Sequence, residues 1–358
     1  MSEPTEYYSL GVMSGSSLDG LDLARVRFRK LHSGWRYHLC EAETIPFPPE
    51  LEETLGRIAS ADKQQLKAAD QALGHFIALS IQDFIRRHRI RRVDVIGSHG
   101  HTVRHHPAQR DTLQIGNARE IARLCQRPVV WNLRKKDVLA GGQGAPIVPI
   151  ADWHLFPNYE VLLNLGGIAN VSIKGSGRIS AWDICPFNQV FNYYARQCGK
   201  AYDRGGKLAG SGSVHPQALE KILRLPYFSR RPPKSLDNQF SREVIAALDR
   251  YALSPADASA TWVRATARLI AREIPDRSVV YVTGGGAFHR TAIQALRQEH
   301  RGQVIVADQQ MIQSKEALAM AFMAVLRLRG EVNVLSSVTG ARRDTVCGDL
   351  VTPLTLRK

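Results

Sequence analysis

The sequence predicts an α/β protein built from two lobes. At 358 residues the chain is longer than one hydrophobic core usually serves, so two compact regions are expected. Short apolar strands alternate along the chain with segments of helical periodicity, which is the pattern of α/β architectures. Two strand–turn–strand segments also carry glycine-rich turns, one near the N-terminus and one near the middle of the chain.

Bulk composition excludes several classes of protein. Hydrophobic residues make up 44% and charged residues 23%, which is typical of globular domains. No long apolar run or secretory signal is visible, so we expect a cytoplasmic protein with no membrane partner. Five widely spaced cysteines without metal-ligand spacing indicate reduced thiols. The net charge of +15 is scattered and lacks a nucleic-acid-binding signature, so no nucleic-acid partner is expected.

The first lobe is expected to begin with a glycine-rich hairpin. Residues 7–12 and 21–28 read as strands, and Met13 to Gly20 form the turn between them. Backbone amides and hydroxyls in such a turn can face an anion, so it is a candidate phosphate-binding loop. An ordinary hairpin turn is the alternative interpretation.

The rest of this lobe alternates helix and strand. Helical periodicity covers 49–90, and 92–97 reads as a buried strand that ends in a histidine-rich segment. Residues 112–133 add a strand, a helix and a further strand, and 140–149 read as an ordered Gly/Pro crossover.

The second lobe is expected to repeat the opening hairpin. Strands 161–165 and 168–173 flank Gly166 and Gly167, a weak hint of an internal repeat. The next strand, 179–186, carries Asp183 near its end, where open α/β sheets place their chemistry.

Helices and one further glycine turn complete the second lobe. Helical segments are expected at 187–200, 214–224, 240–252, 255–274, 290–298 and 315–328. The buried strand 278–283 runs into Gly284, Gly285 and Gly286 and then into a helix, which favours contact with a nucleotide. A structural strand-to-helix turn is the alternative.

These features together resemble the superfamily of actin, hexokinase and acetate kinase, a two-lobed actin-like (ribonuclease H-like) fold with a central interlobe cleft. In detail the chain resembles the anhydro-N-acetylmuramic acid kinase family over essentially its full length. The matching segments are GVMSGSSLDGLD (11–22), GSHGHT (97–102), LQIGNAREIA (113–122), LAGGQGAPIVP (139–149), NLGGIAN (164–170), WDICPFN (182–188), DRGGKLAGSG (203–212), PPKS (232–235), VTGGGA (282–287) and SSVTGARRD (336–344).

The resemblance implies a reaction. The family opens the 1,6-anhydro ring of anhydro-N-acetylmuramic acid with water and transfers the γ-phosphoryl group of ATP to O6, in peptidoglycan recycling. The implied cofactors are ATP and Mg²⁺, and the implied partners are ATP, the anhydro amino sugar and a second copy of the chain. The implied lobes are 1–140, with the phosphate hairpin and part of the sugar site, and 141–358, with the second hairpin, the catalytic aspartate and the adenosine turn.

The resemblance also assigns residues. It implies Asp183 as the general base, since water must lose a proton as it attacks the anomeric carbon. The implied ATP-binding residues are Gly15, Ser16, Ser17, Leu18, Asp19, Gly20, Leu21, Asp22, Gly166, Gly167, Gly284, Gly285 and Gly286. The implied sugar-binding residues are His99, Thr102, Arg134, Asp137, Gln143, Asn188 and Asp203. Candidate metal ligands are Asp19, Asp183 and Asp203.

The chain departs from the common family pattern at several positions. They are His101, Asn132, Cys185 to Asn188, Leu236 to Gln239 and His289. Two alternatives therefore stay open: a kinase of the same fold for another anhydrosugar or amino sugar, and a catalytically weak nucleotide-binding paralogue.

Overall fold

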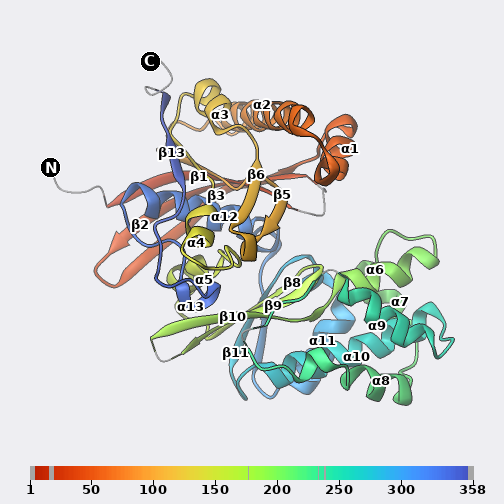
Figure 1. Ribbon diagram of the computed structural model, residues 1–358. Helices are drawn as coiled ribbons and strands as arrows, with labels where there is room; N and C mark the ends of the chain where they lie inside the picture. The colour runs from red at the N-terminus through yellow and green to blue at the C-terminus, as the bar shows by residue number, and fades with distance from the viewer. Residues whose placement is uncertain (1–4, 16–19, 176, 233, 238, 354–358) are drawn as a thin grey trace. The chain divides into compact units, whose positions relative to one another are not determined.

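The chain folds into two compact units, each built on a sheet flanked by helices (Figure 1). The computed structural model describes residues 5–15, 20–175, 177–232, 234–237 and 239–353. Unit 1 comprises Met1–Phe156 and Gln313–Lys358, and unit 2 comprises Pro157–Ile312. This division differs from the expected lobes, because the chain crosses after Phe156 and its last segment returns to unit 1.

Unit 1 contains most of the strands. They are β1 (Glu6–Ser14), β2 (Leu21–Leu31), β3 (Gly34–Ile45), β4 (Val95–Ser98), β5 (His101–His106), β6 (Asp111–Ile115), β7 (Val129–Trp131) and β13 (Asp349–Val351). Its α-helices are α1 (Pro49–Arg57), α2 (Lys63–Arg87), α3 (Ala118–Cys125), α4 (Lys135–Leu139), α5 (Pro149–Leu155) and α13 (Ser336–Thr339), and α12 (Gln309–Leu328) enters it from unit 2. Its 3₁₀ turns are η1 (Ile58–Ser60) and η2 (Pro107–Gln109).

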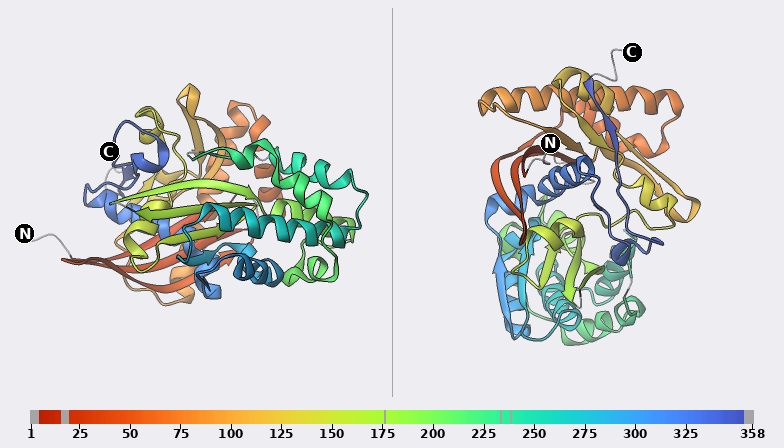
Figure 2. Two further views of the ribbon diagram at one scale, coloured as in Figure 1. Left: turned by 90° about the horizontal axis from the view of Figure 1, so that it is seen from below. Right: turned by 90° about the vertical axis from the view of Figure 1, so that its left-hand side faces the viewer.

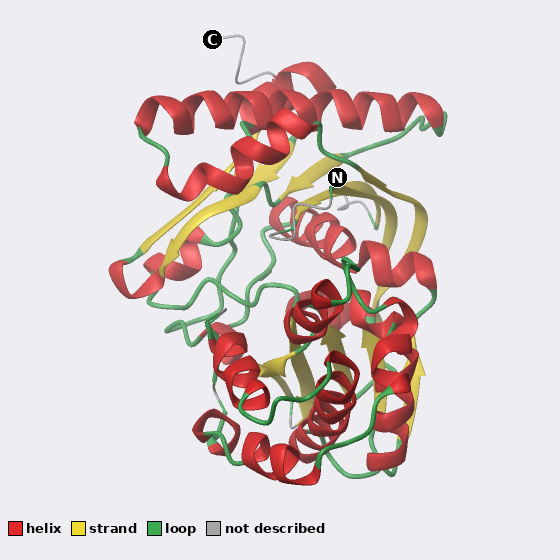
Figure 3. Ribbon diagram, turned by 90° about the vertical axis from the view of Figure 1, so that its right-hand side faces the viewer, coloured by secondary structure: helices red, strands yellow, loops and turns green. Residues whose placement is uncertain are grey.

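Unit 2 holds a second sheet and a layer of helices. The strands are β8 (Val161–Leu165), β9 (Ile168–Gly175), β10 (Arg178–Pro186), β11 (Val279–Thr283) and β12 (Gln303–Val306). The α-helices are α6 (Asn188–Gln197), α7 (Lys207–Ser211), α8 (Pro216–Leu223), α9 (Phe240–Asp249), α10 (Pro255–Glu273) and α11 (Arg290–Glu299). The 3₁₀ turns are η3 (Arg204–Gly206), η4 (Pro226–Ser229) and η5 (Gly285–Phe288). Figure 3 shows helices in red packed against strands in yellow within each unit.

The two sheets share a five-stranded topology, to which unit 1 adds the antiparallel edge strand β13. The order is β13-β7-β4-β1-β2-β3 in unit 1 and β10-β9-β8-β11-β12 in unit 2. In each, an antiparallel three-stranded meander is extended by two parallel strands beside its first strand. This repeated order is the duplicated ribonuclease H-like core of the actin-like fold, so the predicted fold class and the hint of an internal repeat are confirmed.

Alternation along β1 decides which helix covers each face of the first sheet. Leu10 and Val12 point into a core shared with Leu73 and Ile77 of α2. Ser9, which precedes Leu10 and points to the opposite face, donates a hydrogen bond to the carbonyl oxygen of Ala321 in α12. Figure 2 shows α2 in orange and α12 in blue on opposite sides of the red strands.

Two glycines let α12 approach the sheet closely. A Cβ on Gly11 would lie 1.7 Å from the carbonyl oxygen of Ala317, and one on Gly97 would lie 2.2 Å from that of Met320. Helix and sheet backbones therefore meet directly, which accounts for the return of the C-terminal segment to unit 1.

A capping box divides the helical segment that the sequence predicts over 49–90. Asp62 accepts hydrogen bonds from the amides of Gln64 and Gln65, while the Gln65 side chain accepts from the Asp62 amide. This arrangement starts α2 afresh after α1 and η1.

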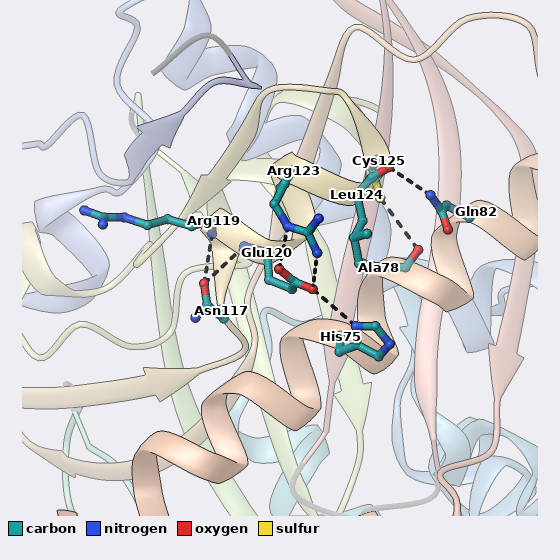
Figure 4. A network of polar contacts seen from close by, with 9 residues as sticks. All are labelled: His75, Ala78, Gln82, Asn117, Arg119, Glu120, Arg123, Leu124 and Cys125. Atoms are coloured by element: carbon teal, nitrogen blue, oxygen red, sulfur yellow. Dashed lines mark hydrogen bonds and ion pairs between the residues drawn. The ribbon is translucent and has the colours of Figure 1, made fainter. Parts of the chain in front are cut away.

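Polar contacts join α2 to α3 (Figure 4). Glu120 lies between His75 and Arg123, at 3.2 Å and 2.8 Å. Gln82 donates to the carbonyl oxygen of Leu124, and Asn117 caps α3. The two helices thus form one layer over the sheet.

Candidate active site

The turn between β1 and β2 is the candidate phosphate loop. The ladder closes at Ser14 and Leu21, and the described turn residues are Gly15 and Gly20. Gly20 has a φ of +152°, and a Cβ there would lie 2.7 Å from the carbonyl oxygen of Ile45, so glycine is required. The predicted ligands Ser16, Ser17, Leu18 and Asp19 lie outside the described residues.

The side chains of the two predicted ATP-binding residues that follow the turn make contacts within the protein. Leu21 is fully buried in the core and pairs with Ser14 and Ile45 in the sheet, so its side chain does not meet a ligand. Asp22 accepts a 2.6 Å hydrogen bond from the Thr44 hydroxyl of β3. This bond fixes the strand that carries the loop.

His101 ties the end of β1 to the histidine-rich segment. Its Nδ1 lies 3.2 Å from the Ser14 hydroxyl oxygen. Burial lowers the pKa of His101 and favours the neutral ring. His101, one of the departures from the common family pattern, therefore makes a neutral hydrogen bond beside the loop.

His99 and Arg134 form a hydrogen-bonded pair in unit 1. Arg134 Nε donates to His99 Nε2 at 2.9 Å, so His99 carries its proton on Nδ1 and donates it to the Gly100 carbonyl oxygen. Burial, with help from the nearby guanidinium, lowers the pKa of His99 to about 3. The pair presents a neutral imidazole and a cation that also donates to the Gly144 carbonyl oxygen.

Asp137 is the centre of a buried polar cluster. Its two carboxylate oxygens accept from the Gly144 amide and the Thr339 hydroxyl, each at 2.8 Å. Burial raises the pKa of this carboxyl, although both hydrogen bonds oppose the shift. Because the side chain is fully buried and engaged, Asp137 shapes the loop around Gln143.

Three predicted sugar-side residues of unit 1 are accessible. Gln143 is exposed, with its amide held by the Thr339 carbonyl oxygen. Arg134 is half-buried, and Thr102 is half-buried on β5 opposite Gln114. The structure therefore brings His99, Arg134, Asp137 and Gln143 together through direct bonds and through Gly144 and Thr339.

In unit 2 the second glycine turn is bonded to the start of α6. Phe187 and Asn188 donate their amides to the carbonyl oxygens of Gly167 and Gly166, at 2.7 Å and 3.1 Å. Asn188 is thereby fixed beside this turn, at the first position of its helix.

The Gly284–Gly286 turn packs against the same hairpin. Gly284 has a φ of +81°, and a Cβ there would lie 2.6 Å from Asn164 Oδ1. A Cβ on Gly286 would lie 2.5 Å from the Phe187 ring, whereas nothing lies within 4 Å of one on Gly285. Gly285 is exposed and is the member of the turn that stays open to a ligand.

Asp183 stands at a bulge in β10. The ladder with β9 shifts register between Asp183 and Cys185, which re-aims the side chains there. The Asp183 carboxylate is half-buried, and its Oδ2 accepts the Leu236 amide at 2.9 Å. Among the described residues, none makes a hydrogen bond to its Oδ1. Burial raises the pKa of Asp183, partly opposed by the Leu236 amide, which suits a general base.

The Asp203 carboxylate is engaged by backbone amides of its own unit. Its oxygens accept the amides of Leu208 and Ala209 at 2.8 Å and 3.0 Å. His289 Nε2 lies 3.5 Å from Asp203 Oδ2, and its Nδ1 accepts the Ala292 amide. Burial opposes ionisation of Asp203, but His289 and these amides outweigh it and lower its pKa. Asp203 is therefore held by these two backbone amides, with the His289 ring beside it.

The described residues contain no group of three His, Cys, Asp or Glu side chains that could hold a metal ion. Both oxygens of Asp203 and one of Asp183 are already engaged. This donor set fits Mg²⁺ carried by a nucleotide, because Mg²⁺ in such sites takes most of its ligands from phosphate and water. Within the described ranges, no helix has the length and apolar character needed to cross a membrane.

Several residues around these groups escaped sequence reasoning. Thr339 lies 202 positions from Asp137, and Tyr227 lies 44 from Asp183, to whose carbonyl oxygen it donates. No local pattern marks such partners, although the SSVTGARRD and PPKS segments place Thr339 and Lys234 in matched motifs.

The family model and the curated relatives agree on one family. The family model described as anhydro-N-acetylmuramic acid kinase matches residues 7–353. The protein of that name from Shewanella loihica is 32% identical, over 97% of this chain and 99% of its own. The one from Thiobacillus denitrificans is 34% identical, over 95% of each chain. A solved activator of the 2-hydroxyisocaproyl-CoA dehydratase from Clostridium difficile with bound ADPNP is 13% identical, with a TM-score of 0.44 over 90% of this chain and 96% of that one.

Proposed function

The chain belongs to the anhydro-N-acetylmuramic acid kinase family, and on this premise we propose that it is an ATP-dependent anhydrosugar kinase. Its substrates are anhydro-N-acetylmuramic acid, ATP and water, and its products are N-acetylmuramic acid 6-phosphate and ADP. The observation that carries the proposal is Asp183, a half-buried carboxylate with one oxygen held and a raised pKa.

Asp183 is the general base of this reaction. Water attacks the anomeric carbon and gives its proton to the carboxylate, while the bond from that carbon to O6 breaks. O6 takes the γ-phosphoryl group, and the bond from the γ-phosphorus to the bridging oxygen breaks to release ADP. The fixed Oδ2 leaves Oδ1 to take the proton.

The remaining residues position the substrates. The backbone of the β1–β2 turn meets the phosphates, and the open face of Gly285 meets the adenosine. Arg134 and Gln143 hold the sugar, with His99 fixing the guanidinium and Asp137 fixing the loop. Such positioning accounts for most of phosphoryl transfer, which requires little covalent chemistry from the protein.

The proposal extends to the metal, the compartment and the assembly. Mg²⁺ enters with ATP and neutralises charge on the transferred group. ATP as co-substrate supports a cytoplasmic location. A homodimer is proposed from the family, and sedimentation at micromolar concentration would distinguish it from a monomer.

The test is ADP release with anhydro-N-acetylmuramic acid and ATP-Mg²⁺. We expect turnover that requires the sugar, and a loss of at least about 10³-fold in kcat for Asp183→Asn with nucleotide binding retained. Activity on another anhydrosugar alone, or nucleotide binding without turnover on any, would replace the proposal with one of its alternatives.

A further inference from the structure

A short segment between η4 and α9 binds Asp183 through backbone groups of the segment. Residues 234–236, here called the strap, run beside the catalytic carboxylate. The Asp183 amide donates to the Lys234 carbonyl oxygen at 3.2 Å, and the Leu236 amide donates to Asp183 Oδ2 at 2.9 Å. The strap thus holds both the backbone and one carboxylate oxygen of the general base.

The strap is anchored by a buried ion pair. Lys234 Nζ lies 2.6 Å from Glu273 Oε1, at the end of α10, and the Lys234 side chain is only 3% exposed. Glu273 Oε2 accepts the indole N–H of Trp182 at 2.9 Å. Since Trp182 precedes Asp183, one carboxylate binds both the strap and the strand that carries the base.

Tyr227 also connects Asp183 with Lys234. Its hydroxyl donates to the Asp183 carbonyl oxygen at 2.8 Å. The ammonium of Lys234 lies 5.3 Å from the Tyr227 ring centroid, within range of a cation–π contact. Lys234 therefore contacts both Glu273 and Tyr227. Tyr227 also binds Asp183, and Glu273 also binds Trp182.

We propose that the Lys234–Glu273 pair positions Asp183 for the reaction, acting through the strap rather than by touching substrate. The proposal rests on the proposed function, because it assigns the role of general base to Asp183. It also explains how the departure from the common family pattern at Leu236 is accommodated: the contact to Asp183 comes from a backbone amide, which any residue except proline supplies.

The first test removes the anchor. In Lys234→Met and Glu273→Gln we expect kcat to fall about 10- to 100-fold, with nucleotide affinity within about twofold of the original protein. Glu273→Gln keeps an acceptor for Trp182. Arg264→Met is the matched control, because it removes the 3.0 Å ion pair of the same helix with Glu299 and should leave kcat unchanged. Unchanged kcat in a folded anchor variant overturns the proposal.

A second pair of variants keeps the test decisive if the anchor variants do not fold. Leu236→Pro removes the amide that holds Oδ2, whereas Leu236→Ala retains it. We expect Leu236→Pro to show a kcat loss like that of the anchor variants, and Leu236→Ala to stay within about threefold of the original. Equal behaviour of the two overturns the role of the strap.

Hydrogen exchange separates this proposal from the proposed function. In the intact protein we expect slow exchange at the Leu236 amide, and exchange at least tenfold faster in Lys234→Met or Glu273→Gln. If the original protein shows no turnover, the proposed function fails, and the exchange result still decides whether the pair orders the strap. Equal exchange rates overturn the proposal whatever the activity.

Discussion

The bond between Arg134 and His99 sets the protonation of a histidine. A guanidinium only donates, so the ring nitrogen it meets must accept, and the ring stays neutral. Neither His99 nor the Gly144 carbonyl group is an acid, so these hydrogen-bond partners leave the positive charge of Arg134 available to a ligand. The sequence marked both residues by motif but carried no information on which nitrogen holds the proton.

Acid should destabilise the protein through His99. The pKa of His99 is about 3 in the folded chain and about 6.5 when unfolded, so only the unfolded chain binds a proton between these values. The stabilisation is complete above pH 6.5, and up to about 1.4 kcal/mol is lost per pH unit below it. Denaturant unfolding at pH 7, 6 and 5 should show a shallower pH dependence for His99→Asn. An unchanged dependence would contradict this.

Asn132 illustrates a departure that the structure explains. Its amide nitrogen donates to Asp349 Oδ2 at 2.7 Å, tying β7 to the edge strand β13. An aspartate at position 132 would place two carboxylates together there. Motif comparison identified the substitution, but its partner lies 217 positions away and has no local signal.

At the scale of elements, glycines decide how closely backbones pack. The hairpins could be predicted, because apolar strands flank each glycine turn. The start of α12 at Gln309 and the edge strand β3 could not. The first residues of α12 are polar, and most positions of β3 are half-buried. Neither segment therefore shows a clear hydrophobic periodicity in the sequence.

Gly11→Ala should disrupt the contact between β1 and α12. The added methyl would meet the Ala317 backbone, so we expect a loss of about 3 kcal/mol in unfolding free energy. Gly175→Ala is the control, because nothing lies within 4 Å of its Cβ position. Chemical denaturation measures both, and equal stability of the two variants would refute the close approach.

Alanine substitutions at the adjacent glycines of η5 should have different effects, one on folding stability and the other on nucleotide binding. Gly286→Ala meets Phe187 and should lower stability, whereas Gly285→Ala meets no protein atom and should not. If adenosine lies on Gly285, its alanine variant should bind nucleotide about tenfold more weakly, or about 1.4 kcal/mol. Calorimetric titration checks the affinity, and unchanged affinity would place the nucleotide elsewhere.

At the scale of the whole molecule, a repeated sheet topology organises the chain. The sequence indicated this repeat through two similar hairpins, and the strand orders confirm it. The return of residues 313–358 to unit 1 had no sequence signal, because it depends on contacts of Gly11 and Gly97 with a distant helix. The place of Asp183 near the end of a strand was predictable, and its role as general base stays a prediction. The anchor of Asp183 was not predictable, since Lys234 and Glu273 are 39 residues apart.

The central claim is that ring opening and phosphoryl transfer occur in one reaction. Phosphorus and proton NMR of a completed mixture of protein, ATP-Mg²⁺ and anhydro-N-acetylmuramic acid tests it most directly. We predict one ADP and one ring-opened N-acetylmuramic acid 6-phosphate for each sugar consumed. ADP without sugar phosphate, or a phosphorylated sugar with its anhydro ring intact, would contradict the account.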